Sequence, residues 1–270
     1  MRASVISTLA CAALVSACQW PEGERATAAF AASGTTATAP DVGAGASARS
    51  ESRVDGAVEV EEETADFLFA YAWPAAVGRL PGLAAELDKR RQAAKAELVT
   101  QAQEARAEAE ANGYPHRQHA YEMTWQVVTD LPGWISLSGA VYTYRGGAHP
   151  NSTTQSLVWD KANSRALNGV DLFTSADALQ AALGTAYCDG MRNAWLDKLG
   201  QLPEGRPCPN LGELVVLPGS SNGRTFDRLT LVAPPYVAGP YAEGAYEFDL
   251  TIDSAVRRTV RPEYRDAFGG

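Results

Sequence analysis

Tyr121-Glu-Met-Thr-Trp-Gln-Val127 is the stretch that decides the fold, because apolar and polar residues alternate along it. A period of two predicts a β-strand with one apolar and one polar face. Leu131-Pro-Gly133 follows as a turn, and further strands are expected over residues 134–144 and 153–160. Three successive strands joined by short connections predict an antiparallel meander.

Before this meander, the sequence predicts a strand and a long helix. Residues 64–73 form an apolar, aromatic run of strand length that Pro74 ends. From Pro81 onward, apolar residues recur at helical spacing, and Asn112-Gly113 supplies a C-terminal stop. A helix is therefore expected over about 81–111.

After the meander, a second helix and further strands are predicted. Thr174 and Asp177 form a capping-box pattern, and helical spacing of apolar residues continues from there to Gly200. This pattern predicts a helix over about 175–200. The remaining strands are expected at 211–217, 226–233 and 246–252. Since helices and antiparallel strands are segregated along the chain, the predicted fold class is α+β, with antiparallel sheets and two main helices.

The start of the chain has the order of a bacterial export signal that ends in a lipobox. Arg2 precedes an apolar run over residues 5–15, and small residues then lead to Cys18. The run is too short for an ordinary transmembrane helix. We expect residues 1–17 to be removed as a signal peptide and Cys18 to be acylated, with cleavage without acylation as the alternative. Acyl chains hold a protein to a bilayer with roughly 0.8 kcal/mol per buried methylene.

Residues 18–63 are predicted to be the lipidated cysteine and a flexible linker. Residues 19–56 are rich in Ala, Thr, Ser and Gly and poor in bulky apolar residues, so they bury too little surface to fold alone. Val58–Glu63 adds negative charge before the folded part, which is expected to begin at residue 64.

The chain is acidic, and its negative charge limits the classes of partner that it can attract. The formal net charge is -9, and removal of residues 1–17 takes away Arg2 and no acidic residue, which gives -10. Such a charge disfavours nucleic acid and anionic lipid headgroups as partners and favours basic ones. A solvated surface that only keeps the protein soluble is the alternative.

Two cysteines remain outside the leader and the lipobox, Cys188 and Cys208. In an oxidising compartment outside the cytosol, this pair predicts a disulfide. It would close a loop of about 20 residues and stabilise the fold by about 3 kcal/mol. A catalytic thiol is disfavoured because no histidine is near in sequence, and a zinc site because neither cysteine belongs to a Cys-x-x-Cys pair.

Enzyme motifs are weak in this sequence. His116, His119 and His149 could supply a tri-histidine zinc site, which would make the protein a metal-assisted hydrolase acting on cell-wall polysaccharide. No H-E-x-x-H pattern accompanies them, and no serine sits in a strand-to-helix G-x-S-x-G nucleophile elbow. The Gly146-Gly147 loop has neither a P-loop nor a dinucleotide fingerprint. We therefore assign no catalytic residue, metal or cofactor, and keep the hydrolase as the alternative function.

Four short motifs resemble a known exported family. They are Tyr142-Thr-Tyr-Arg-Gly-Gly-Ala-His-Pro-Asn151, Asp171-Leu-Phe173, Pro235-Tyr236 and Pro240-Tyr-Ala-Glu-Gly244. Together they are similar to the domain of unknown function in the extracellular part of RsiV-type anti-sigma factors and in PdaC-type peptidoglycan deacetylases. The preceding stretch, 67–128, resembles the usual companion of that domain. The resemblance implies an N-terminal companion domain over 64–145 and an RsiV/PdaC-like C-terminal domain over 146–270.

The resemblance implies a non-catalytic binding module. RsiV binds lysozyme, a basic protein, through this module, and an acidic surface would suit such a partner. We expect neither sigma-factor release nor deacetylation, because the sequence shows no cytoplasmic anti-sigma segment and no deacetylase domain. The expected partners are a membrane, through the lipid, and a lysozyme-like protein or peptidoglycan, with no nucleic acid.

Two loops, residues 146–151 and 236–244, are the candidate contact regions. Proline beside tyrosine makes the 236–244 loop stiff, so its rings could face a partner or, alternatively, cover the end of the core. The candidate ligand-binding residues are Tyr144, Gly146, Gly147, His149, Asn151, Tyr236, Tyr241 and Glu243. We expect an exported, membrane-anchored lipoprotein. In a Gram-negative host, Gln19 after the cysteine favours the outer membrane, facing the periplasm.

Overall fold

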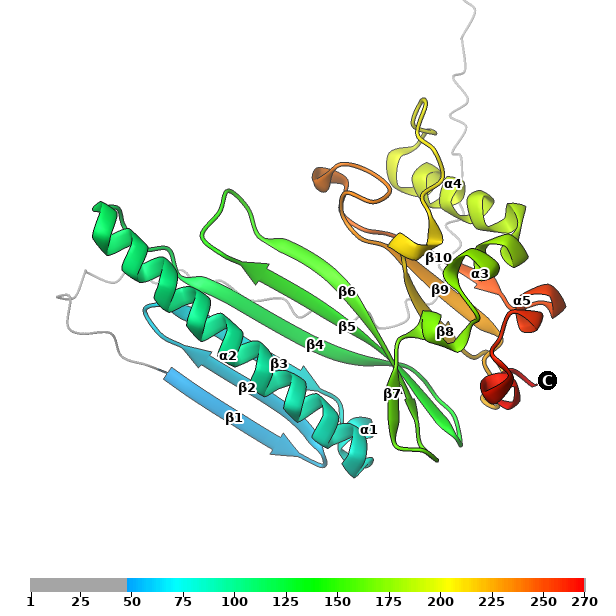
Figure 1. The fold of residues 1–270 in the computed structure, drawn as a ribbon, viewed down its shortest axis with the longest axis horizontal. Helices are drawn as coiled ribbons and strands as arrows, with labels where there is room; N and C mark the ends of the chain where they lie inside the picture. Colours follow the sequence, from blue (N-terminus) through cyan, green and yellow to red (C-terminus); the bar gives the residue numbers. More distant parts are fainter. Residues whose placement is uncertain (1–47, 270) are drawn as a thin grey trace, which may run out of the picture. The chain divides into compact units, whose positions relative to one another are not determined.

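The computed structural model describes residues 48–269 and shows a seven-stranded sheet followed by a three-stranded sheet (Figure 1). The predicted leader, Cys18 and residues 19–47 lie outside the described residues. In the first sheet, the strands lie in sequence order: β1 (Ala48–Val54), β2 (Ala57–Glu63), β3 (Phe67–Trp73), β4 (His119–Asp130), β5 (Trp134–Tyr144), β6 (Asn151–Asp160) and β7 (Arg165–Leu167). The α+β class predicted from the sequence is confirmed.

The first sheet has one parallel pair where an antiparallel sheet was predicted. Between β3 and β4 the chain runs through α1 (Ala75–Gly78) and the long helix α2 (Pro81–Asn112), which the sequence predicted as 81–111. The helix returns the chain to the end of the sheet at which β3 began, so β4 pairs with β3 in parallel, with Phe67 beside His119. The other pairs of this sheet are antiparallel.

The prediction of a flexible linker through residue 63 is wrong for residues 48–63, which form a β-hairpin. Asp55 and Gly56 both have positive φ, 50° and 90°, which suits a tight two-residue turn. Val58 and Val60 are buried, whereas Glu59 and Glu61 are exposed. The alternation of a strand was therefore present in Val58–Glu63, and the density of glutamates concealed it.

One face of the first sheet packs on α2. The helix buries Leu83, Leu87 and Leu98 against aromatic residues of the strands. Within this core, the indole N–H of Trp125 donates to the hydroxyl of Tyr71 at 2.9 Å. Burial raises the pKa of Tyr71 to about 12, so this hydroxyl stays protonated at any physiological pH.

The second part of the fold places helices around the three-stranded antiparallel sheet. The strands are β8 (Val215–Gly219), β9 (Arg228–Ala233) and β10 (Tyr246–Thr251), in the order β10-β9-β8. The helices are α3 (Ala176–Leu183), α4 (Thr185–Leu199) and α5 (Ser254–Arg258), with 3₁₀ turns η1 (Gly169–Leu172), η2 (Leu211–Glu213), η3 (Tyr241–Glu243) and η4 (Pro262–Phe268).

The second predicted helix, 175–200, is divided in two at Gly184. The φ of this glycine is 56°, outside the helical region, so α3 ends before it and α4 begins after it. Cys188 of α4 bonds to Cys208, with a Cα–Cα distance of 5.7 Å, so the predicted disulfide is confirmed. The bond ties α4 to the segment before η2.

The predicted domain boundary at 145/146 falls at the tip of the β5–β6 hairpin. These two strands pair from Trp134 and Asp160 to Thr143 and Asn151, so β6 belongs to the first sheet. Neighbouring residues of β6 also serve different cores, because Trp159 faces α2 while Val158 packs into the second core. The described residues accordingly lie within one compact unit.

None of the helices in the described part of the chain combines the length and the apolar character needed to cross a membrane.

Candidate functional site: an open sheet face and the groove at its end

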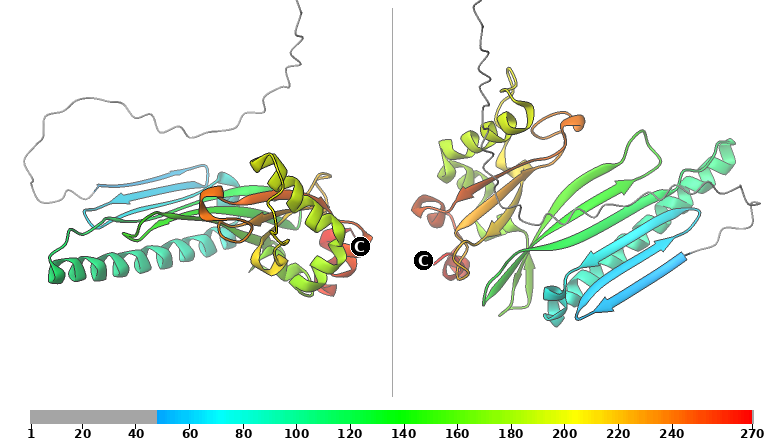
Figure 2. Two further views of the ribbon diagram at one scale, coloured as in Figure 1. Left: turned by 90° about the horizontal axis from the view of Figure 1, so that it is seen from above. Right: turned by 180° about the vertical axis from the view of Figure 1, so that it is seen from behind.

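Helix α2 lies against one face of the first sheet and leaves the other face uncovered (Figure 2, left). Along β2, β3 and β4, alternate residues point to this side, which we call the open face. Its members are Glu59, Glu61, Glu63, Leu68, Ala70, Ala72, Ala120, Glu122, Thr124 and Gln126. The four carboxylates among them are exposed, whereas the alternate residues of the same strands fill the core against α2.

The carboxylates of the open face are not neutralised. Ala70 lies in register between Glu61 and Glu122, so these two glutamates stand two strand spacings apart, about 10 Å. The open face carries no lysine or arginine. Within residues 48–269, none of its four carboxylates forms an ion pair. The result is a concentrated negative potential over a flat surface of small side chains.

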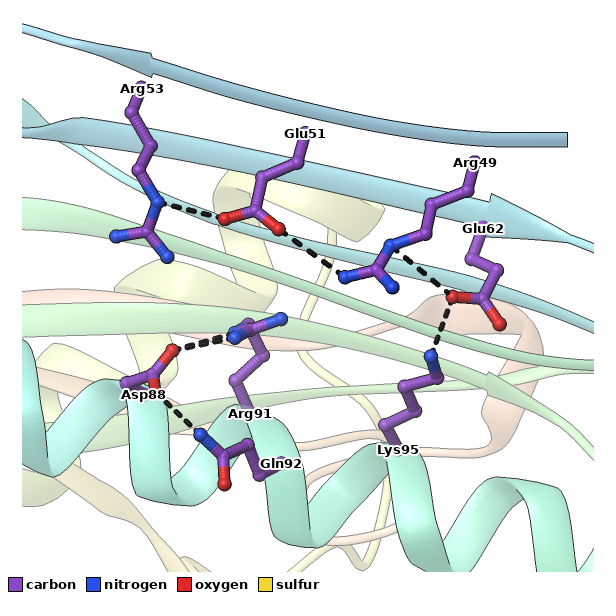
Figure 3. Close-up of polar contacts among 8 residues, drawn as sticks. All are labelled: Arg49, Glu51, Arg53, Glu62, Asp88, Arg91, Gln92 and Lys95. Atoms are coloured by element: carbon purple, nitrogen blue, oxygen red, sulfur yellow. Dashed lines mark hydrogen bonds and ion pairs between the residues drawn. The ribbon is translucent and has the colours of Figure 1, made fainter.

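Charges on the α2 side are, by contrast, paired in two clusters (Figure 3). One cluster joins Arg49, Glu51, Arg53, Glu62 and Lys95, and the other joins Asp88, Arg91 and Gln92. Glu62 of β2 is central, because its carboxylate lies 2.5 Å from Nζ of Lys95 and 3.8 Å from Nε of Arg49. A hydrogen bond from Arg53 lowers the pKa of Glu51. This side of the sheet therefore satisfies its own charges.

A groove of about 620 Å³ lies at the end of the open face, over β4, β5 and β6. In register, Tyr142 stands between Glu122 and Ser152, and Ala140 stands between Thr124 and Thr154. The small side chain of Ala140 leaves the floor hollow between larger neighbours. Farther along the same face, β8 packs on β4, β5 and β6, so the groove occupies the part that the second sheet leaves free.

The opposite wall of the groove is the loop between β9 and β10, residues 235–245. Arg206 holds this loop through two bonds to the Glu243 carboxylate, at 2.6 and 3.0 Å, and Tyr246 donates to the same carboxylate. The bonds from Arg206 and then Tyr246 lower the pKa of Glu243. Lys198 donates to the backbone carbonyl of Glu243 at 3.0 Å. The wall is therefore preformed, and Glu243 contributes to it as a structural residue.

The two loops predicted as contact regions do come together. His149 stacks on Tyr241 with ring centroids 4.0 Å apart, and its Nε2 lies 3.3 Å from the hydroxyl of Tyr236. The Tyr241 hydroxyl donates to the carbonyl of Pro150 at 2.6 Å. Tyr236 has a φ of 74° and is 63% exposed as a residue. These contacts join the β5–β6 hairpin tip to the β9–β10 loop beside the groove.

The other candidate residues shape the hairpin tip. The hydroxyl of Tyr144 donates to the carbonyl of Gly147 at 3.1 Å, and Gly146 has a φ of 75°. Asn151 is exposed and lies opposite Thr143 at the start of β6. Sequence reasoning did not select Glu122, Tyr142 or the other groove residues on the strands. For Glu122 and Thr124, the available signal was the polar half of the alternation over 121–127.

The three histidines do not form one site. The rings of His116 and His119 are 5.9 Å apart, whereas His149 is held by Tyr236 and Tyr241. Over residues 48–269, no three side chains of the metal-binding types are placed to hold an ion together. The tri-histidine arrangement on which the hydrolase alternative depended is therefore not seen.

His119 is the one buried histidine among these three. Its Nδ1 has no hydrogen-bond partner among the described residues. Burial, followed by the nearby His116 and Arg145, lowers the pKa of His119. This ring is therefore neutral in the folded protein near pH 7.

Comparison with known proteins supports a PdaC-like region. Residues 60–152 match a family model described as deacetylase PdaC. The matched residues fall mainly within the predicted N-terminal companion domain, 64–145. No curated protein matches the chain. The match supports the PdaC-like resemblance over residues 60–152, which include one of the four motifs, 142–151. The other three motifs lie outside the match, and the likeness to RsiV stays a prediction.

Two solved structures of DUF3298 family proteins are similar to the chain. One is from Bacteroides fragilis, with 17% identity, coverage of 77% of this chain and 88% of that chain, and a TM-score of 0.42. The other is from Pseudomonas aeruginosa, with 16% identity, coverage of 83% and 97%, and a TM-score of 0.43.

Proposed function

We propose that the protein is an exported, non-catalytic binding module that captures a basic protein on the open face. The observation that carries the proposal is the row of unpaired carboxylates Glu59, Glu61 and Glu63, continued across β3 by Glu122. A lysozyme-like protein is the partner that the RsiV resemblance implies. The charge of this face supports that choice over an acidic ligand.

The physical basis is electrostatic complementarity. Four like charges on a surface without cations attract a basic partner over distances of about a Debye length, roughly 8 Å at physiological salt. Such charges accelerate association and select partners more than they add raw affinity. The small residues Ala70 and Ala72 keep the face flat, so a rigid globular partner can approach it closely. The account predicts binding that weakens as salt increases.

Calorimetric titration with hen lysozyme tests the proposal. We expect binding to the wild-type protein at low salt and a loss of about tenfold in affinity, or about 1.4 kcal/mol, for the double variant Glu59→Gln/Glu61→Gln. The matched control is Glu104→Gln, an exposed glutamate of α2, which should bind as the wild type does. A parallel titration uses peptidoglycan fragments. Heat with these fragments alone would reject the basic protein as partner.

The lipid attachment is part of the same proposal. Cys18 lies outside the described residues, and its acylation is supported by the lipobox pattern alone. An acylated Cys18 would hold the module at a membrane outside the cytosol, where a partner from outside the cell could reach the open face. Intact mass of the membrane-extracted protein tests this step. The mass should equal that of residues 18–270 plus acyl chains, and the Cys18→Ala variant should carry no lipid.

A further inference from the structure

We propose that the groove is a receptor site for one cationic side chain, an arginine or lysine presented by the protein partner. The inference rests on the proposed function and names the group that the partner inserts. Its basis is the juxtaposition of the Glu122 carboxylate with the rings of Tyr142 and Tyr241 in one hollow.

The charge in the groove comes from Glu122. Both Glu122 and Glu243 line it, but Arg206 neutralises Glu243. Glu122 is exposed and has no hydrogen-bonding or ionic partner within residues 48–269. No lysine or arginine lines the groove. A cation placed there would therefore meet one uncompensated carboxylate, because the charge of Arg206 is paired with Glu243 and that of Lys198 is bonded to backbone carbonyls of the wall.

Aromatic rings complete the site for a cation. Tyr142 is the direct cross-strand neighbour of Glu122, at a separation that brings side chains of a sheet into contact. Tyr241 stands on the facing wall, where its stacking with His149 fixes the ring. A guanidinium or ammonium group over a tyrosine face gains cation–π attraction, and a guanidinium also stacks on the ring. This set of groups matches arginine best.

The groove has room for a side chain of this size. Its volume of about 620 Å³ is in the range of pockets that bury drug-sized ligands, so it admits an arginine together with neighbouring atoms of the partner. The hydroxyls of Thr124 and Thr154 flank Ala140 on the floor, so they can accept hydrogen bonds from the N–H groups of a guanidinium. Because Arg206 and Lys198 already hold the wall, little ordering is needed on binding.

The test is a titration of the full chain, followed by amide NMR, with two capped tripeptides, acetyl-Gly-Arg-Gly-amide and the same peptide with citrulline in place of arginine. Citrulline has nearly the same shape without the charge. We expect shifts at Tyr142, Ala140 and Tyr241 with the arginine peptide, and affinity at least fivefold weaker with citrulline. Glu122→Gln should lose at least fivefold for the arginine peptide, whereas the control Glu104→Gln, an exposed glutamate of α2, should change less than twofold.

Several results would overturn the inference. They are equal binding of the citrulline peptide, no effect of Glu122→Gln, or an equal effect of Glu104→Gln, which would indicate diffuse attraction only. Tighter binding of free arginine than of the peptide would assign the groove to a small molecule. If lysozyme binds wild type and Glu122→Gln equally, the groove inference fails and the proposed function stands. If the arginine peptide binds in the groove but no basic protein binds, the proposed function fails and the groove still stands as a site for a cationic side chain.

Discussion

Tyr71 and Trp125 form a hydrogen bond in the first core that couples β3 to β4 across their parallel pairing. Replacement Tyr71→Phe would keep the ring and leave the indole N–H of Trp125 buried without a partner. We expect the free energy of unfolding to fall by about 1–3 kcal/mol, the usual effect of an unsatisfied buried donor. Urea denaturation followed by tryptophan fluorescence measures it. A fall below about 0.5 kcal/mol would show that water or another acceptor replaces Tyr71.

His119 makes the fold sensitive to mild acid. Its pKa is lowered in the folded state, mainly by burial, while the unfolded chain protonates it near the ordinary value of about 6.5. Below that pH, the unfolded state binds the proton more readily, so the free energy of unfolding decreases as pH falls from 7 to 5. We expect His119→Gln to lose less stability over this interval than the wild type. Urea denaturation of both proteins at pH 7 and pH 5 measures these losses. Equal losses of unfolding free energy in the wild type and in His119→Gln would contradict the account.

At the scale of residues, the sequence was enough to select several side chains that lie together, but not to assign what each of them does. His149, Tyr236 and Tyr241 were selected as an exposed group on two loops, and they do lie together. Glu243 was also selected, but its carboxylate is taken by Arg206, a pairing that only the folded chain reveals. Glu122 was overlooked because nothing in a single strand shows which polar face will be left uncovered.

At the scale of elements, β1 is held by backbone pairing with β2 and by charged side chains. Every residue of this strand is exposed, so it adds no side chain to the core. Glu62 links the hairpin to α2 through Arg49 and Lys95. We expect Glu62→Gln to lower stability by about 0.5–1 kcal/mol and to speed hydrogen exchange of amides 48–54. Glu61→Gln, which faces the other side, should leave that exchange unchanged. Equal exchange in both variants would show that backbone pairing alone holds β1.

The disulfide stabilises the second part of the fold. Cys188 and Cys208 are 20 residues apart, and their bond fixes α4 to the segment before η2. For the double variant Cys188→Ser/Cys208→Ser, we expect a loss of about 3 kcal/mol, as the chain-entropy estimate gives for a loop of that size. Thermal unfolding under oxidising and reducing conditions measures the effect. A wild-type transition unaffected by reductant would contradict it.

Elements with strong periodicity were predictable, and those governed by context were not. Helix α2 matches its predicted range within one residue, because spacing, Pro81 and Gly113 all agree. The parallel pairing of β3 with β4 depends on where the crossover helix packs, which no local pattern states. The break between α3 and α4 requires a positive φ at Gly184, and a glycine within a helical pattern does not by itself predict such a break.

At the scale of the whole molecule, the β5–β6 hairpin connects the two cores. Its long strands carry residues for the α2 core and for the second core on opposite faces. The arrangement is visible where β4, β5 and β6 extend from α2 toward β8 (Figure 1). Sequence reasoning placed a domain boundary at the tip of this hairpin because motifs cluster after it. The strands themselves show that the cores are built on one continuous sheet.

Opposite faces of that sheet have opposite electrostatic arrangements. The α2 side pairs its charges in the two clusters of Figure 3, and the open face leaves four carboxylates without an ion pair. Like charges repel one another and do not stabilise the fold, and their grouping on one surface supports the proposal of a basic partner. The proposed capture of a basic protein supplies that partner.

The most direct measurement is a footprint of lysozyme on the chain, by amide NMR or hydrogen exchange at low salt. The proposal predicts perturbed amides along β2, β3 and β4 at the open-face positions and around the groove, with the outer surface of α2 unchanged. Protection on α2 or α4 in place of β2 to β4, or no protection at all, would contradict the assignment of the open face as the binding surface.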